Sequence, residues 1–370
     1  RNSGDYLCRI DEVRSMMRDA SEESQDVALV ERFGLECLDM GTVGRYRQRF
    51  DSRHAEHIWS RLSDQGFLRA IGAAGVDLDG TLHPTRAGLL MFGRDQDIIH
   101  EFGHYFLDYR QQTDPETRWQ DRITSMTGDW SGNLYDFYFR AYGQMKAALK
   151  VPFRMEGIFR VDDLPVHKAL REALANCLTN ANWFERKGVV CLWEDDRLVI
   201  ANPGDFRMEV EIARQPGESD PRNETLLRMF SLVEIGERAG SGMGIIFDGW
   251  ADAGLAEPTY EEQFGPDRTV LTLPLVPVAG ADNIRQKADE SEQKRTKANK
   301  SGQNGLSLHE KQIVKVIQAS EVPAKASDIS AVLGLGKTRT SELLKDLIEK
   351  GYVVAEGATR SRRYRLIDCG

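Results

Sequence analysis

The sequence is poor in cysteine and has no long apolar run. Its 370 residues contain an odd number of scattered cysteines, namely Cys8, Cys37, Cys177, Cys191 and Cys369. They form no C-x-x-C pair and no zinc-ribbon spacing, so we expect neither a disulfide framework nor a structural zinc site. No stretch approaches the roughly 18 apolar residues that a membrane-spanning helix needs. These absences predict a reduced, cytoplasmic protein without a membrane partner.

An excess of positive charge is also missing. The net charge is −9, with 29% charged and 41% hydrophobic residues. This composition is typical of a globular protein, and the length predicts two or three domains. An acidic total excludes a uniformly basic nucleic-acid binder but allows a basic module within the chain. The sequence begins RNSGDYLCRI, without an initiator Met or a signal peptide, so we expect it to start inside a longer protein.

The P-loop pattern G-x-x-x-x-G-K-[ST] is absent, so we do not expect a helicase motor. Large apolar side chains are scarce in GADNIRQKADESEQKRTKANKSGQNG, which predicts a flexible linker. We therefore expect an N-terminal α/β region at 1–150, a middle domain at 151–278, a linker at 279–306 and a C-terminal domain at 307–370.

The most informative residues form a helical pattern in REALANCLTN. Glu172, Asn176 and Asn180 follow each other at intervals of four, which places them on one face of a helix. Glu172 could orient a water molecule, and Asn176 could give an oxygen to Mg²⁺, which prefers oxygen ligands. The helix therefore predicts one wall of a magnesium and nucleotide site.

Two glycine-containing turns follow this helix. The strand DRLVIANPG ends in the turn Asn202-Pro203-Gly204. The loop GSGMG leads into another helix. Backbone N–H groups at the start of a helix bind phosphate well. We expect this role for Gly240, Ser241, Gly242 and Gly244.

The order of these motifs resembles the ATP-binding domain of gyrase, histidine kinases and mismatch-repair ATPases, the GHKL class. REALANCLTNANW, DRLVIANPG, RNETLLRMF and ERAGSGMGII, preceded by TRAGLLMFG, are more closely similar to bacterial transcriptional regulators with a Schlafen-type AlbA-like N-terminal domain. Proteins of that family are sometimes labelled ATP-dependent DNA helicases. The resemblance covers roughly residues 80–275 and implies an α+β multidomain protein with a GHKL-like α/β sandwich. It also implies that most of the AlbA-like domain precedes this chain.

The resemblance implies ATP and Mg²⁺ as cofactors, with Glu172 as the general base of any weak hydrolysis and Asn176 as the Mg²⁺ ligand. It places Asn180, Asn202 and Gly204 in the nucleotide pocket, together with Arg222 of the lid sequence RNETL. Asn202 stands where the ATPases have Asp, and Phe206 replaces the second glycine of that motif. These departures leave an empty, degenerate pocket in a scaffold protein as the alternative.

The last 65 residues have the pattern of a winged helix-turn-helix. Three helical segments, LHEKQIVKVIQAS, KASDISAVLG and KTRTSELLKDLIEKG, precede a hairpin in YVVAEGATRSRRYRL. The third helix is expected to enter the major groove of double-stranded DNA, and the wing to reach phosphates. The expected contacts are Lys337, Thr338, Arg339 and Thr340 on the helix, and Arg360, Arg362 and Arg363 on the wing. A protein-docking role is the alternative.

The N-terminal region contains a second helix-and-hairpin pattern. We expect a helix over His54–Gly66, a hairpin around DLDGTLHPT, Thr85 as a helix cap and a helix over Trp130–Leu149. His100-Glu101-Phe102-Gly103-His104 also spells the H-E-x-x-H signature of zinc peptidases. No third ligand follows it and HYFLDYRQ favours a strand, so a chance match is the preferred interpretation.

Together these patterns predict a DNA-binding transcriptional regulator whose nucleotide pocket modulates DNA binding or assembly into a homodimer. We expect nucleotide to order the segment Asp205–Val233, which contains Pro216, Gly217 and many polar residues.

Overall fold

The computed structural model describes residues 24–112, 119–150, 154–156, 159–161, 163–215, 217, 219–236, 242–264, 266–278, 308–318, 323–333, 337–356 and 362–366, with isolated positions between 10 and 17. The chain divides into two compact units, residues 1–281 and 282–370. The linker expected at 279–306 lies outside the described residues.

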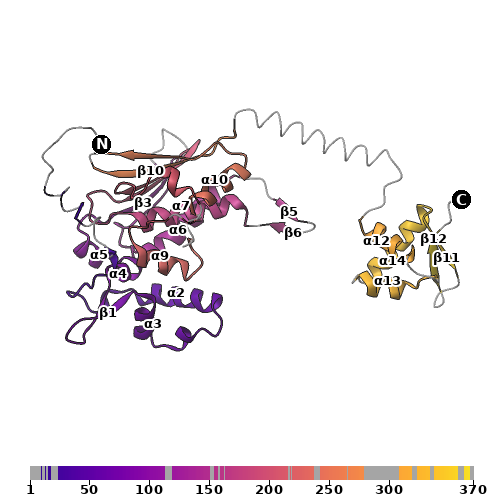
Figure 1. Cartoon of the computed structure of the whole chain (residues 1–370), viewed down its shortest axis with the longest axis horizontal. Coiled ribbons are helices and arrows are strands. Elements are labelled where there is room, and N and C mark those ends of the chain that lie inside the picture. The colour runs from indigo at the N-terminus through magenta and orange to yellow at the C-terminus, as the bar shows by residue number, and fades with distance from the viewer. Residues whose placement is uncertain are drawn as a thin grey trace. The chain divides into compact units, whose positions relative to one another are not determined.

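Unit 1 begins with a group of short helices and one hairpin, shown in indigo in Figure 1. The elements are η1 (Gln25–Val27), η2 (Leu35–Cys37), α2 (Met40–Arg53), η3 (Ile58–Arg61), α3 (Asp64–Ile71), β1 (Ala74–Val76), β2 (Leu82–Pro84), α4 (Arg86–Phe92) and α5 (Asp95–Glu101). The hairpin and the Thr85 cap were predicted: the Thr85 hydroxyl accepts from the Gly88 amide at 3.0 Å.

The helix predicted over His54–Gly66 is wrong. His54 ends α2, a 3₁₀ turn follows, and Ser63 caps α3 by accepting from the Gly66 amide at 3.2 Å. The Ser63 side chain offers the free amides of a new helix a partner, so the chain restarts there.

A mixed six-stranded sheet forms the centre of unit 1, in the order β4-β3-β7-β8-β10-β9. β3 and β7 are parallel, and the other neighbours are antiparallel. The strands are β3 (Leu107–Gln111), β4 (Asp121–Thr124), β7 (Val189–Trp193), β8 (Arg197–Pro203), β9 (Thr259–Gln263) and β10 (Arg268–Pro274). β3 and β4 precede the domain boundary expected at residue 150, yet they belong to the same sheet as the later strands.

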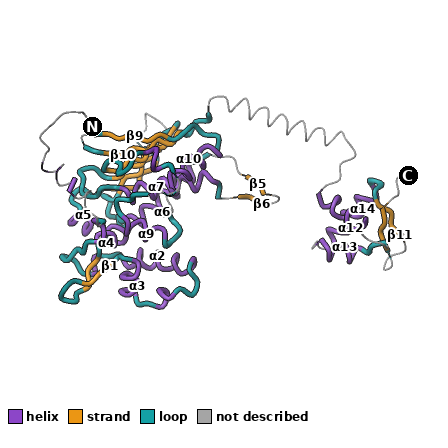
Figure 2. Tube along the Cα trace, in the orientation of Figure 1, coloured by secondary structure: helices purple, strands orange, loops and turns teal. Residues whose placement is uncertain are grey.

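The helices of this part are α6 (Leu134–Ala148), α7 (Pro165–Asn180), α8 (Val210–Ala213), α9 (Glu224–Ser231) and α10 (Gly242–Asp252), and a small hairpin of β5 (Arg154–Glu156) and β6 (Phe159–Val161) precedes α7. In Figures 1 and 2, α6, α7 and α10 lie beside the sheet, and α9 lies nearer the N-terminal helices. The expected helix over Trp130–Leu149 begins later, at Leu134, because the Asn133 side chain caps it.

α7 and α10 are in close contact. A Cβ built on Gly249 would lie 2.6 Å from the Pro165 carbonyl oxygen and 2.8 Å from Ala169 Cβ, so only glycine fits there. This approach brings the first residue of α10 onto α7 two turns further along.

Unit 2 is a small three-helix domain with a hairpin. Its elements are α12 (Leu308–Gln318), α13 (Ala326–Leu333), α14 (Lys337–Glu349), β11 (Val353–Glu356) and β12 (Arg363–Leu366). Leu343, Leu344 and Leu347 of α14 are buried, and Gly351 adopts φ +77° after the last turn of that helix. The predicted α+β multidomain fold with a C-terminal winged helix is confirmed. No helix in the described parts of either unit has the length and apolar character needed to cross a membrane.

Candidate functional site

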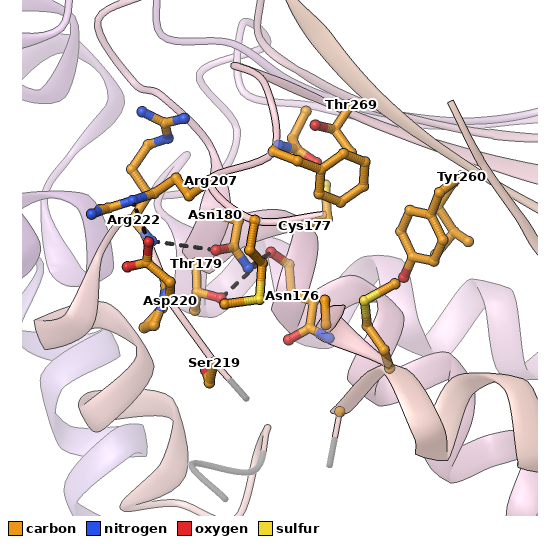
Figure 3. A pocket seen from close by; sticks show the side chains of 18 of the residues that line it. Asn176, Cys177, Thr179, Asn180, Arg207, Ser219, Asp220, Arg222, Tyr260 and Thr269 are labelled. Carbon is orange, nitrogen blue, oxygen red and sulfur yellow. Dashed lines mark hydrogen bonds and ion pairs between the residues drawn. The ribbon is translucent and has the colours of Figure 1, made fainter. Parts of the chain in front are cut away.

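A cavity of about 130 Å³ lies in unit 1 between α7 and the strands β8, β9 and β10. Figure 3 shows it from close by. Glu172, Asn176 and Asn180 all line it, so the predicted helix face does form one wall. The apolar residues between them, including Ala173 and Cys177, are buried against the sheet and fix the rotation of the helix.

One end of the cavity is formed by Glu172, Asn176 and the start of α10. The Glu172 residue is only 5% exposed. A Cβ built on Gly242 would overlap the Glu172 carboxylate and lie 3.0 Å from Asn176 Nδ2. Oxygen-bearing carboxylate and amide groups suit a hard cation such as Mg²⁺, and the start of a helix suits phosphate.

The other end is formed by Asn202 on β8 and Thr269 on β10, which are direct cross-strand partners. Both are buried, and both line the cavity. The Thr269 hydroxyl donates to the Gly204 carbonyl at 3.0 Å, which ties the end of β10 to the turn after β8. Gly204 itself adopts φ +99°, so the turn requires glycine there.

Thr269 was missed by the sequence analysis. A signal was present, since Thr269 stands two and four residues before Leu271 and Leu273 and therefore shares their face of the strand.

Arg222 holds the rim of the cavity together. Its guanidinium lies 3.2 Å from Asp205 Oδ1 and donates to the Asp205 carbonyl oxygen at 3.1 Å. Its backbone amide donates to Asn180 Oδ1 at 3.3 Å, and Asn180 Nδ2 donates to the Asn176 carbonyl at 2.9 Å. Figure 3 shows Asn180 beside Arg222 in this arrangement. Arg222 therefore joins the end of α7 to the turn after Gly204.

Asn223 stands directly before α9, at the position of a helix cap, but its side chain does not cap that helix. Asn223 Nδ2 donates to the Thr179 and Ala181 carbonyls, both at 2.9 Å, and so provides hydrogen bonds to carbonyl groups at the end of α7. The amides at the start of α9 are instead bound by η1 and its preceding residue. Ser24 Oγ accepts from the Glu224 amide at 3.3 Å, and Asp26 Oδ2 accepts from the Leu226 amide at 2.8 Å.

Two aromatic side chains line the cavity beside β9. The rings of Phe206 and Tyr260 are 5.6 Å apart and pack edge to face. Phe206 is anchored by its backbone amide, which donates to Glu262 Oε1 at 2.8 Å. Burial raises the pKa of the Tyr260 hydroxyl above its usual range. Burial also raises the pKa of the Cys177 thiol to about 12, so this thiol stays protonated and is no nucleophile near neutral pH.

Of the other glycine-loop residues that were predicted to bind phosphate, only Gly244 lies within the described residues. Gly244 lies in the first turn of α10, where a Cβ would meet no atom within 4 Å. Gly240 and Ser241 lie outside the described residues.

In unit 2 the predicted DNA contacts divide into three groups. Lys337, Thr338 and Arg339 form the first turn of α14, and their side chains are outside the described part. Thr340 is fully buried, so it packs in the domain core and does not face a DNA groove. It lies three and four residues before two buried leucines and shares their face of the helix. Arg362 and Arg363 are exposed, and Arg360 lies outside the described residues.

The H-E-x-x-H sequence does not form a zinc site. His100 and Glu101 end α5, and His104 lies beyond that helix. The strand expected over HYFLDYRQ begins only at Leu107, so the two histidines occupy neither one helix nor one strand. Glu101 is bound by Arg32 and Arg86 at 3.0 and 2.8 Å. Across the described ranges, no three His, Cys, Asp or Glu side chains gather as a metal-ligand set.

Comparisons with known proteins agree with this division. Residues 14–108 match the model "Domain of unknown function (DUF8451)", residues 192–273 match "Putative ATP-dependent DNA helicase recG C-terminal", and residues 306–369 match "Winged helix DNA-binding domain". A search of curated proteins gave no match.

Two solved structures are similar to the chain. The DIP2311 protein from Corynebacterium diphtheriae aligns with a TM-score of 0.52 and 16% identity, over 96% of this chain and 72% of that chain. A MarR/EmrR family transcriptional regulator from Acinetobacter sp. ADP1 aligns with a TM-score of 0.17 and 25% identity, over 24% of this chain and 64% of that chain. The family models, and not these structures, show that the chain carries an ATPase-like domain and a winged helix DNA-binding domain.

Proposed function

We propose that this protein is a DNA-binding regulator whose cavity in unit 1 binds ATP with Mg²⁺ and thereby modulates DNA binding. One observation carries the proposal: a single face of α7 lines a cavity that runs from the start of α10 to the buried pair Asn202 and Thr269. A phosphate-attracting helix start at one end and buried hydrogen-bonding groups at the other suit a nucleotide.

The residues near α10 fit the triphosphate and its metal. Mg²⁺, when bound, would neutralise phosphate charge, and Asn176 would supply an oxygen ligand to it. Backbone amides at the start of α10 would donate to phosphate oxygens. In a weak hydrolysis reaction, Glu172 would orient the attacking water and accept its proton.

The rim has to open for a complete nucleotide. The cavity of about 130 Å³ is smaller than typical ligand pockets of roughly 300–1,000 Å³. Residues 205–208, 213 and 219–222 line the cavity at this rim, and Arg222 joins Asp205 to the end of α7. Only the part of Asp205–Val233 before Arg222 is therefore proposed to rearrange, because Arg222 and Asn223 are buried.

α9 is the proposed route from the cavity to the N-terminal helices. Ser24 and Asp26 bind its first amides. Near the end of α9, Tyr46 Oη donates to the Met229 carbonyl at 2.7 Å. Just beyond that end, Arg49 Nε donates to the carbonyl of residue 233 at 3.2 Å, and His54 Nε2 lies 2.9 Å from the carbonyl of residue 232. Because α9 begins two residues after Arg222, a rearranged rim that changes the bonds of the Arg222 side chain would reach the N-terminal helices through one short element.

The test is calorimetric titration of ATP with Mg²⁺ into the full chain and into Asn176→Ala. We expect micromolar binding by the wild type and at least a tenfold loss in the variant, since the metal ligand is removed. Duplex binding with and without nucleotide, and sedimentation for the expected homodimer, would then test the coupling.

A scaffold with an empty cavity is the second candidate, and the small cavity volume and the Phe206 ring favour it. In that case a folded protein would bind no nucleotide while retaining salt-dependent affinity for duplex DNA.

A further inference from the structure

Asn202 is a buried amide at the end of the cavity formed by β8 and β10. The residue is 6% exposed and lines the cavity next to the apolar cross-strand pair of Ile200 and Leu271. Its cross-strand partner, Thr269, lines the same end. Buried amides need hydrogen-bond partners, so the bonds available to Asn202 determine what this end can recognise.

Part of its hydrogen-bonding capacity is already used. Asn202 Nδ2 donates one hydrogen to the Pro203 carbonyl at 3.3 Å, a long bond. The second Nδ2 hydrogen and Oδ1 remain for a ligand. The Thr269 hydroxyl donates to the Gly204 carbonyl, so it offers a ligand only its oxygen lone pairs.

The two ends of the cavity are separated by about the length of a nucleotide. Glu172 and Asn180 are eight residues apart on α7, which is about 12 Å along the helix axis. Asn180 is joined through Arg222 to Asp205, close to the Asn202 end, whereas Glu172 touches the start of α10. Phosphates at α10 therefore place the base of the same nucleotide beside Asn202.

We propose that this cavity accepts guanine as well as adenine nucleotides, and that Asn202 determines this tolerance. The inference rests on the proposed nucleotide-binding function. Adenine presents an amino donor beside a ring-nitrogen acceptor, which match Oδ1 and an Nδ2 hydrogen. Guanine presents a carbonyl acceptor beside a ring N–H donor, which match the same amide rotated by a half turn.

The rotation has a small cost. It turns Oδ1 towards the Pro203 carbonyl and removes the 3.3 Å bond from Nδ2. One weak hydrogen bond is worth no more than about a tenfold change in affinity, so adenine should be preferred only modestly. A carboxylate at this position would have no donor for the guanine carbonyl and would reject it much more strongly.

The test is parallel titration of ATP and GTP, each with Mg²⁺, into the full chain and its Asn202→Asp and Asn202→Ala variants. We expect the wild type to bind both within about tenfold of each other. Asn202→Asp should prefer ATP by about 100-fold or more, and Asn202→Ala should weaken both nucleotides.

The outcomes are separable. Binding of ATP with rejection of GTP by the wild type, or an unchanged ratio in Asn202→Asp, would overturn the inference and leave the proposed function intact. Absence of binding for both nucleotides would overturn the proposed function and the inference with it. If Asn202→Asp failed to fold in circular dichroism, the wild-type ratio and Asn202→Ala would still decide.

Discussion

Gly242 lies directly against Glu172: a methyl group built on the glycine would overlap the Glu172 carboxylate and lie 3.0 Å from Asn176 Nδ2. Two residues later on the same helix, a methyl group on Gly244 would meet no atom within 4 Å. The two glycines are therefore a matched pair for testing the phosphate end of the cavity.

We expect Gly242→Ala to weaken the binding of ATP with Mg²⁺ at least tenfold, because either the carboxylate or the start of α10 must move. Gly244→Ala should change affinity by no more than about twofold and should stabilise α10 by up to about 1 kcal/mol. Calorimetry and thermal unfolding of both variants measure these effects. Equal affinities in the two variants would contradict the position given to the phosphates.

Arg222→Ala should destabilise unit 1 by about 1–3 kcal/mol, because it removes the ion pair with Asp205 at a site where the Arg222 side chain is only 8% exposed. The variant should also be cleaved faster by protease between residues 205 and 221. Arg53→Ala is the control, since the Arg53–Glu234 pair is about half exposed and is worth about 0–1 kcal/mol. Equal denaturant midpoints for the two variants would show that the Arg222–Asp205 ion pair does not stabilise unit 1.

Asp26 gives a prediction about pH. Burial raises its pKa above the usual range, even though Ser24 and the Leu226 amide donate to it. The folded state therefore binds the proton more tightly than the unfolded state, and this carboxyl contributes less stability as pH rises. The contribution falls from the ordinary carboxyl pKa up to the raised folded value and then levels off.

Asp26→Asn removes this titration. The stability of the variant relative to wild type should increase across that pH interval and remain constant above it, as measured by urea unfolding at several pH values. A difference that does not depend on pH would show that Asp26 does not titrate differently on folding.

The proposed role of the wing arginines can be tested by measuring DNA binding. Arg362→Ala with Arg363→Ala should weaken binding to a generic duplex and reduce the salt slope by about one for each lost phosphate contact. Arg365→Ala is the control on the same strand, because Glu356 already neutralises Arg365. An unchanged salt slope in the double variant would favour protein docking for this domain.

Features set by local sequence were predictable. The four-residue spacing of Glu172, Asn176 and Asn180 predicted that they share one face of α7, and Thr85 was predicted to cap α4. Each of these features depends only on residues within a few positions of one another. The winged helix was predictable for the same reason, because each of its short helices and strands has a recognisable spacing of apolar residues.

Features set by distant contacts were not predictable in this way. Asn223 has the sequence position of a cap, but carbonyls at the end of α7 take its side chain. Thr340 looks like a groove contact in KTRTSELL, yet the helix rotation set by the core buries it. The pairing of β3 with β7 joins strands some 80 residues apart, and no local pattern indicates that register.

The binding of Ser24 and Asp26 to the first turn of α9 has a consequence for biosynthesis. The two partners are 200 residues apart in the chain. At a ribosome speed of about 5–20 residues per second, the N-terminal segment waits roughly 10–40 s before its partner helix is made. Asp26 is buried only after that interval, so the first helices have to remain soluble on the ribosome without the element that completes their packing.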